Sequence, residues 1–247
     1  MDLPEEYVKQ IALGIDQTAN LSDLNNMTDR GEFPLKPWTA AKTISTMSLI
    51  REFNISDEEV LLEKFQEYSK ISIQVFTEQV YEHQIKYFGY YKYSKVVIFR
   101  YTYCCIIINS LKGNQTEKLF DAWAKQNGIK LSMPELILDT KYHIDRLQLN
   151  EEKKVISFIS VKPNLFRKNF MQYQDVFAGL QLLTKISGIS WRIYYRDGSE
   201  FRLIQLSTLE SAQQKVIIEW SENYNPEEIQ NITPVILKLK NENQVLI

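Results

Sequence analysis

The sequence predicts an α/β (α+β) protein in which helices flank a mixed central β-sheet. From residue 114 onward, segments with the apolar spacing of helices alternate with short apolar runs typical of strands. The predicted order there is helix, strand, strand, strand, helix, strand, strand, which favours a sheet covered by helices. The preceding residues carry mostly helical patterns. We therefore expect a mainly helical region over residues 1–109, for DNA recognition or dimerisation, and a catalytic core over 110–247.

Composition limits the classes of protein that fit. The 247 residues are 44% hydrophobic and 24% charged, which is ordinary for a globular protein with a normal core. The net charge of -2 means that a nucleic-acid surface would have to arise from local clustering of basic residues. Cys104 and Cys105 are adjacent in an apolar run, so we expect reduced core residues and no zinc cluster.

Targeting signals are not evident in the sequence. The N-terminus has no basic segment followed by an apolar one, so it does not resemble a signal peptide. The longest apolar run, near Val96–Ile108, contains Arg100 and is predicted to be too short and too polar to span a membrane. These features predict a cytoplasmic protein.

Helical signals dominate the N-terminal region. Apolar residues spaced along 7–15 predict a first helix, and Ser56 with Glu59 forms a capping-box pattern that opens a second. A third helix is expected over about 73–87, and two prolines predict an extended loop over 33–39.

The core begins with a second capping-box pattern, Asn114 to Glu117, which predicts a helix ending at Asn127–Gly128. The tyrosine-rich stretch Tyr87–Tyr103 before it fits helix or strand, and that choice stays open. Strand-like runs follow over 135–139, continuing to 143–145, and over 155–162.

A polar turn over 150–154 predicts that the last two runs form a hairpin. A helix over roughly 169–186 precedes two alternating runs that flank Asp197–Gly198, a strong hairpin signal. A helix around 209–221 and an extended tail complete the chain.

One group of polar residues lies where the predicted hairpin strands end. Asp145 closes the first strand, and Ser160 and Lys162 lie at the end of the next, on one face because strand side chains alternate. A carboxylate supplies the hard oxygen that Mg²⁺ prefers, and a bound metal ion lowers the pKa of its water. A lysine beside them orients that water or stabilises negative charge, so the group fits metal-assisted phosphodiester cleavage.

The run Ile144–Asp145 followed by Ser160–Pro163 resembles the active-site signature of the PD-(D/E)xK nuclease superfamily. The order of elements over residues 110–206 is also similar to that superfamily's core. Within it, the chain resembles type II restriction endonucleases of the MjaI type, with Lys36–Pro37 and Met47–Ile50 as the matching upstream segment. The resemblance implies Mg²⁺-dependent cleavage of double-stranded DNA, with Asp145 and Lys162 as catalytic residues.

This chain departs from the family pattern at two places. Ser160 stands where the family has an acidic residue, and no proline precedes Asp145. In such nucleases the preceding helix can supply the missing carboxylate. Glu117 is the candidate, because its spacing to Phe120 and Ala124 places it on the buried face of that helix. The predicted metal ligands are therefore Asp145 and Glu117, with Ser160 lining the site.

Each residue also has a structural interpretation. Glu117 fits a capping box with Asn114, Asp145 fits a hairpin position, and Lys162 before Pro163 fits a solvated strand end.

Three nearby residues are less favoured candidates for the site. Asp139 is an alternative metal ligand, His143 fits a structural role or an indirect contact to the site, and Glu135 fits a strand start.

A basic segment follows the candidate site. Residues 162–202 hold seven Lys or Arg and three Asp or Glu, an excess of four positive charges that would neutralise phosphates. The side chains predicted to contact DNA there are Arg167, Lys168, Asn169 and Gln172. Lys36 and Trp38 are expected on a second DNA-contacting surface, and an ordinary solvated surface is the alternative.

Together these features predict a Mg²⁺-dependent type II restriction endonuclease that leaves 5′-phosphates. Symmetric DNA sites imply a homodimer. The alternatives are a structure-specific repair or recombination nuclease of the same fold, and a non-catalytic DNA- or protein-binding module.

Overall fold

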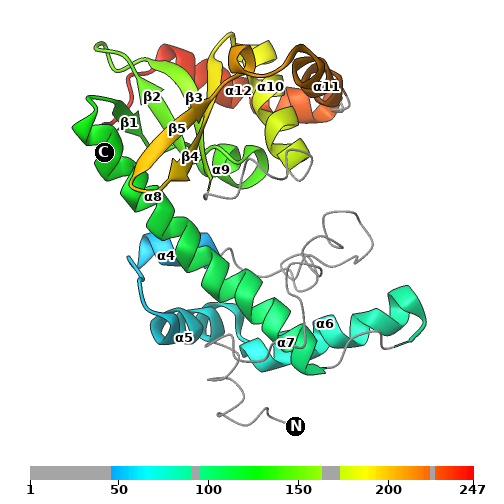
Figure 1. Ribbon diagram of the computed structural model, residues 1–247. Coiled ribbons are helices and arrows are strands. Elements are labelled where there is room, and N and C mark those ends of the chain that lie inside the picture. The colour runs from blue at the N-terminus through cyan, green and yellow to red at the C-terminus, as the bar shows by residue number, and fades with distance from the viewer. Residues whose placement is uncertain (1–45, 91–94, 163–172, 223–225) are drawn as a thin grey trace. The chain divides into compact units, whose positions relative to one another are not determined.

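The computed structural model describes residues 46–90, 95–162, 173–222 and 226–247 (Figure 1). The chain divides into two compact units, residues 1–115 and 116–247, whereas the sequence predicts a division after residue 109. The two units are described separately below. The predicted helix over 7–15 and the predicted loop over 33–39 lie outside the described residues.

The described part of the first unit is helical. Its elements are α4 (Thr46–Glu52), α5 (Glu58–Ser69), α6 (Ile73–Phe88), α7 (Lys95–Tyr103), a π-helical turn (Cys104–Ile108) and the start of α8 (Asn109–Gln126). Phe65, Phe76 and Phe99 lie in its buried core. The predicted helix over 73–87 is confirmed. The predicted cap of α5 is wrong by one residue, because the Asp57 side chain accepts hydrogen bonds from the amides of Glu59 and Val60.

The helices from Lys95 to Gln126 form one continuous stretch, which changes two predictions. α8 begins at Asn109, so Asn114 lies inside a helix and does not cap one. The stretch is also long and apolar enough to cross a membrane by length and composition alone, so the prediction that its apolar part is too short is wrong. More than half of its most apolar window is buried inside the protein, as in the core helix of a soluble protein.

The second unit is built on a five-stranded sheet of order β1-β2-β3-β4-β5. The strands are β1 (Lys130–Ser132), β2 (Arg146–Leu149), β3 (Val155–Lys162), β4 (Ser190–Asp197) and β5 (Glu200–Ile204). β3 and β4 are parallel and the other pairs are antiparallel, so the sheet is mixed as predicted. The β4–β5 hairpin is confirmed, and Gly198 takes the positive φ of 65° that its turn requires. The other predicted hairpin is confirmed at its turn and in β3, but its first strand is residues 146–149 instead of 143–145, so Asp145 precedes that strand and does not close it.

The predicted strand over 135–139 is wrong. Leu136–Tyr142 forms helix α9, and His143 ends it with a left-handed φ of 57°. A short apolar run does not distinguish a buried strand from one face of a short helix, and β1 takes the place of the predicted strand. Asp139 and His143 therefore do not share a strand face with Asp145, and Glu135 precedes a helix.

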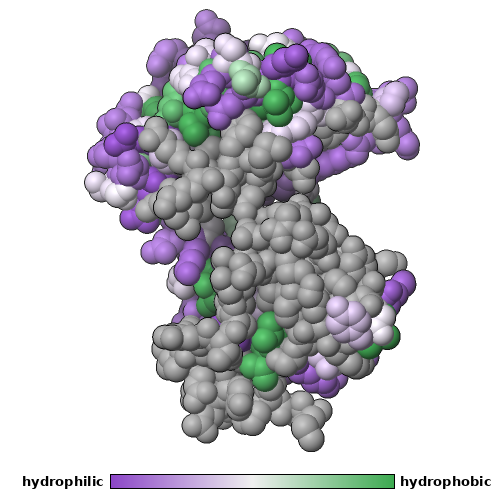
Figure 2. Space-filling model, turned by 45° about the vertical axis from the view of Figure 1, so that its right-hand side comes forward, coloured by the Kyte–Doolittle hydropathy of each residue, from purple (hydrophilic) through white to green (hydrophobic). Residues whose placement is uncertain are grey.

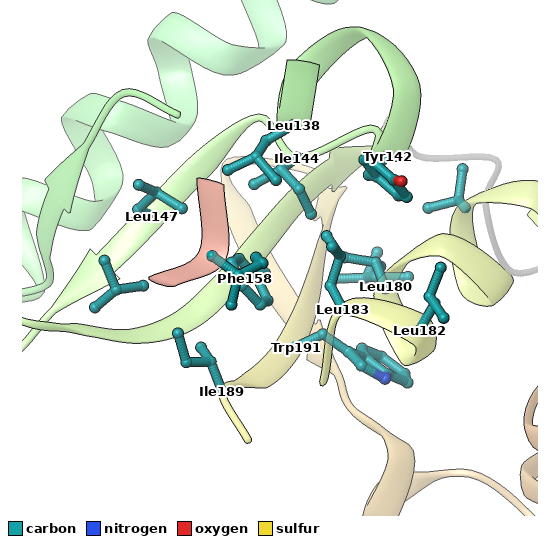
Figure 3. Packing of buried hydrophobic residues seen from close by; sticks show 14 of the residues in the cluster. Leu138, Tyr142, Ile144, Leu147, Phe158, Leu180, Leu182, Leu183, Ile189 and Trp191 are labelled. Carbon is teal, nitrogen blue, oxygen red and sulfur yellow. The ribbon is translucent and has the colours of Figure 1, made fainter. Parts of the chain in front are cut away.

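Helices cover both faces of the sheet. On one face, Phe158 and Leu147 pack with residues of α9, α10 (Gln174–Ser187), α11 (Ser211–Ser221) and α12 (Pro226–Asn241) (Figure 3). On the other face, Phe120 and Ala124 of α8 pack against Ile159 and Val161.

The predicted extended tail is wrong in its first part, because residues 226–241 form α12. Its Ile232, Ile236 and Leu239 are buried in the larger core cluster, and this helical spacing explains why the segment folds against the sheet. On the face shown in Figure 2, most of the coloured residues are hydrophilic, and a few apolar residues lie among them.

Candidate functional site

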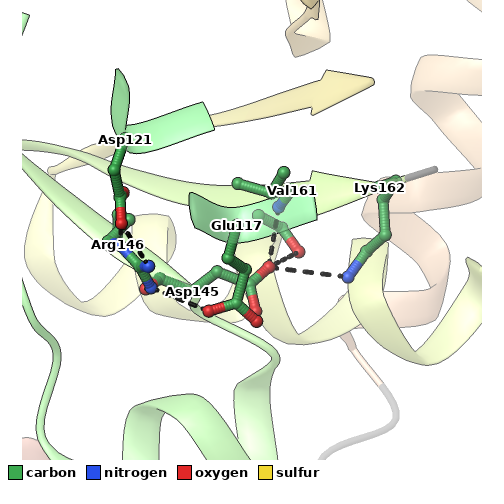
Figure 4. Close-up of polar contacts among 7 residues, drawn as sticks. Glu117, Asp121, Asp145, Arg146, Val161 and Lys162 are labelled. Carbon is green, nitrogen blue, oxygen red and sulfur yellow. Dashed lines mark hydrogen bonds and ion pairs between the residues drawn. The ribbon is translucent and has the colours of Figure 1, made fainter. Parts of the chain in front are cut away.

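Asp145 lies immediately before β2 and beside the end of β3. Its backbone amide donates to the carbonyl of Ile159 at 2.8 Å, which fixes it next to that strand. Its carboxylate Oδ2 accepts from Ser160 Oγ at 3.1 Å and from the Val161 amide at 2.7 Å, and it lies 3.7 Å from Lys162 Nζ (Figure 4). The structure thus brings together the acid, the serine and the lysine that the sequence singled out.

The Asp145 carboxylate is partly open to solvent. Its side chain is 13% exposed and that of Lys162 is 14% exposed, whereas Ser160 is fully buried. All the carboxylate's contacts involve Oδ2, and within the described residues Oδ1 has no hydrogen-bond or ion-pair partner. A carboxylate oxygen is the kind of ligand that a hard cation prefers.

Glu117 reaches the site from the other side, on α8. It is 6% exposed and precedes Phe120 by three residues, so it lies on the face of α8 that packs on the sheet. Its Oε2 accepts from Arg146 Nη1 at 2.9 Å, and the same nitrogen lies 2.5 Å from the backbone oxygen of Asp145. Glu117 is therefore next to the Asp145 backbone, with Arg146 in contact with both. The capping interpretation of Glu117 is wrong, because α8 starts eight residues earlier.

Sequence reasoning missed Arg146, the first residue of β2. Its Nε and Nη2 donate to the two carboxylate oxygens of Asp121 at 2.8 and 2.7 Å, a bidentate pair. Burial opposes the charge of the guanidinium, but the hydrogen bonds and charges of Asp121 and Glu117 outweigh it and raise the pKa of Arg146. Two features of the sequence could have indicated this ion pair: the acids Glu117 and Asp121, four residues apart on α8, and an arginine at the start of an apolar strand.

The charges of this acid–base cluster nearly balance. Three carboxylates, on Glu117, Asp121 and Asp145, face the two cations Arg146 and Lys162, which gives a formal sum of -3 + 2 = -1. In the part of the chain that the structure describes, no three His, Cys, Asp or Glu side chains are placed to hold a metal ion together. A Mg²⁺ ion commonly needs only one or two protein carboxylates, with water and substrate phosphate as its other ligands, so Asp145 fits such an ion.

The predicted DNA-contacting residues are not part of the described structure. Lys36, Trp38, Arg167, Lys168, Asn169 and Gln172 all lie outside the described residues. Among the described basic residues downstream of Lys162, Lys185 pairs with Glu222, and Arg202 pairs with Asp197. Part of the basic excess counted along the sequence is therefore neutralised locally.

Comparison with known proteins gives no relative. No family model, no curated protein and no solved structure matches this chain. What defines the second unit is its own geometry: a mixed α/β domain with a partly buried acid–base cluster where β2 begins and β3 ends.

Proposed function

We propose that this chain is a Mg²⁺-dependent endonuclease of the type II restriction class, with a PD-(D/E)xK-like site that cleaves double-stranded DNA. The observation that carries the proposal is the contact between Asp145 and Lys162, which lie at the ends of neighbouring strands. Glu117 of α8 lies next to them, bound to Arg146. An acid and an amine at one strand end are the groups that metal-assisted phosphodiester hydrolysis uses.

In this proposal Asp145 would hold the metal ion, because its carboxylate has one oxygen besides Oδ2, which already accepts from Ser160 and Val161. A bound Mg²⁺ supplies Lewis-acid polarisation of the phosphate and acidifies a coordinated water. The Lys162 amine orients the attacking water and stabilises negative charge on the phosphate oxygens. The water oxygen bonds to phosphorus, the bond from phosphorus to the 3′ oxygen breaks, and that oxygen takes a proton, which leaves a 5′-phosphate.

The proposal extends to the partners of the protein. A short symmetric DNA site calls for two active sites related by a two-fold axis, hence a homodimer. A cytoplasmic location fits an enzyme acting on DNA.

One observation favours a second candidate, a non-catalytic DNA-binding module. Ser160 replaces an acidic residue of the family pattern, and Arg146 neutralises Glu117, so the cluster holds fewer available carboxylates than a nuclease site of this type.

A cleavage assay separates these proposals. Plasmid DNA is incubated with the full chain and Mg²⁺, Mn²⁺ or a chelator, and with the Asp145→Asn variant as the matched control. Metal-dependent discrete fragments that Asp145→Asn does not produce support the restriction enzyme. Cleavage only at branched or nicked DNA supports a repair nuclease, and DNA binding without cleavage in either metal supports the binding module.

A further inference from the structure

Both carboxylate oxygens of Asp121 on α8 bind Arg146, the residue that follows Asp145 in the chain. In the described part of the chain, Asp121 has no hydrogen bond or ion pair with Asp145 or Lys162 themselves. We infer that Asp121 is a positioning residue: through Arg146 it holds the backbone of Asp145 where the carboxylate of that residue meets Lys162. This inference rests on the proposed function, because it concerns the same site.

The contact between Asp121 and Arg146 fixes the plane of the guanidinium. Nε donates to Oδ1 at 2.8 Å and Nη2 donates to Oδ2 at 2.7 Å, so two parallel bonds join two planar groups. A single bond would let the guanidinium rotate about it, whereas this pair does not. The Arg146 side chain is 5% exposed, so water competes little for these bonds. The orientation of the guanidinium is therefore set by α8.

The remaining guanidinium nitrogen, Nη1, reaches the backbone of Asp145. It donates to the Asp145 carbonyl oxygen at 2.5 Å. On the other side of the same residue, the Asp145 amide donates to the carbonyl of Ile159 on β3 at 2.8 Å. Asp145 is thus held through both of its peptide groups, one by β3 and one by Arg146. These bonds fix the direction in which its side chain leaves the backbone.

α8 is itself fixed where it carries Asp121. The preceding residue, Phe120, is fully buried and packs with Ile159 and Val161 of β3. Close-packed apolar contacts of this kind allow little displacement, so Asp121 keeps its place relative to β3. The carbonyl and the amide of Asp145 are therefore both held with reference to the same packing, that of α8 on β3.

Asp121 is unsuited to a direct role in the proposed reaction. A carboxylate repels the phosphates of DNA, and both oxygens of Asp121 already accept from Arg146. Its loss should therefore slow the chemical step and leave the affinity for DNA nearly unchanged. A misplacement of about 1 Å can cost about 10²-fold in rate, which makes such an indirect effect measurable.

Two measurements on the full chain separate the chemical step from binding: single-turnover cleavage of plasmid DNA, and DNA binding in the presence of a chelator. We expect Asp121→Asn to lower the cleavage rate by about 10–100-fold, the usual effect of losing an outer partner of a site. The Kd for DNA should stay within about twofold of the wild-type value, because Asp121 acts on the reacting groups and not on binding. Asp197→Asn is the matched control, since Asp197 forms an ion pair with Arg202 near the β4–β5 turn, and it should cleave at the wild-type rate. An equal loss of rate in both variants would overturn the inference.

A double variant tests whether Asp121 acts through Arg146. Arg146→Gln and the double variant with Asp121→Asn should cleave at the same rate, because the second substitution removes a partner of a group that is already absent. If the double variant lost the full additional factor of Asp121→Asn, Asp121 would act independently and the inference would be overturned.

Hydrogen exchange of the Asp145 amide, followed by NMR without DNA, tests the anchor independently of activity. We expect Asp121→Asn to speed this exchange by about 10-fold, because a lost hydrogen bond lets Asp145 open locally more often. The amides of β4 report global opening in the same spectra and should be unchanged, as should the Asp145 amide in Asp197→Asn. Unchanged exchange at Asp145 in Asp121→Asn would overturn the inference, whether or not Arg146→Gln folds. Faster exchange, together with a wild-type chain that cleaves no DNA, would reject the nuclease function and leave Asp121 as the anchor of Asp145.

Discussion

Lys162 Nζ lies 3.7 Å from Asp145 Oδ2, across the two strands of one hairpin. The contact joins residues 17 positions apart in the chain, and the β2–β3 register accounts for it, because Arg146 pairs with Ile159. Both side chains are mostly shielded from water, so their charges act on a bound group more strongly than surface charges do.

Removing the lysine amine should therefore abolish most cleavage while preserving the fold. We expect Lys162→Met to lower the cleavage rate by about 10²–10³-fold, the usual effect of losing one charge-stabilising donor. Initial rates on plasmid DNA measure this, with Lys130→Met as the control, because Lys130 lies on β1 and pairs with Glu151. If Lys162→Met cleaved DNA at the wild-type rate, the Lys162 amine would have no role in the proposed active site.

The serine beside Asp145 offers a second prediction. Ser160 is fully buried and donates to Asp145 Oδ2, so Ser160→Ala should lower the free energy of unfolding by about 1 kcal/mol. Because the lost bond orients a proposed ligand, cleavage should also fall by about 10–100-fold. Ser157→Ala is the matched control, since Ser157 is equally buried on β3 and bonds Ser190. Equal losses of activity in both variants would show that Ser160 has no special role.

The strands nearest the site were the most predictable elements. β3 spans Val155–Lys162, the range that the sequence predicted, because a mostly apolar run lies between a polar turn and a proline. The β4–β5 hairpin followed from the Asp197–Gly198 turn. The contact between Asp145 and Lys162 could be anticipated because a hairpin and strand alternation together place both residues at one end.

The charge partners in the cluster could not be predicted in the same way. Whether Glu117 faces a metal ion or an arginine depends on how α8 packs on the sheet, which local patterns do not specify. Nothing in the local sequence marked Arg146, because its partners Asp121 and Glu117 are 25 and 29 positions earlier in the chain. α9 was missed for a different reason, since its apolar run is too short to distinguish the two periodicities.

The first unit gives a prediction on pH. Burial, and then the hydrogen bond to Glu58, raise the pKa of Tyr103 well above its ordinary value near 10. The folded state thus favours the protonated phenol, and its contribution to stability is complete below pH ~10 and declines as the pH rises further. Thermal unfolding between pH 8 and 11 should show a midpoint that falls more steeply in the wild type than in Tyr103→Phe. If the midpoints of the wild type and of Tyr103→Phe fell in parallel with pH, the pKa of Tyr103 would not be raised in the folded state.

The last prediction concerns the stability that Arg146 provides. Removing one partner of a buried ion pair typically costs about 3–5 kcal/mol, because the other charge stays buried without compensation. We therefore expect Arg146→Gln to lower the free energy of unfolding by that amount, since Glu117 is only 6% exposed.

Adding Glu117→Gln and Asp121→Asn should recover most of the loss, because no uncompensated charge then remains around the substituted side chain. Urea unfolding of the four proteins (wild type, single, double with Glu117→Gln, and triple) measures this. A single-variant loss below about 1 kcal/mol, the range of a surface pair, would mean that solvent screens the cluster.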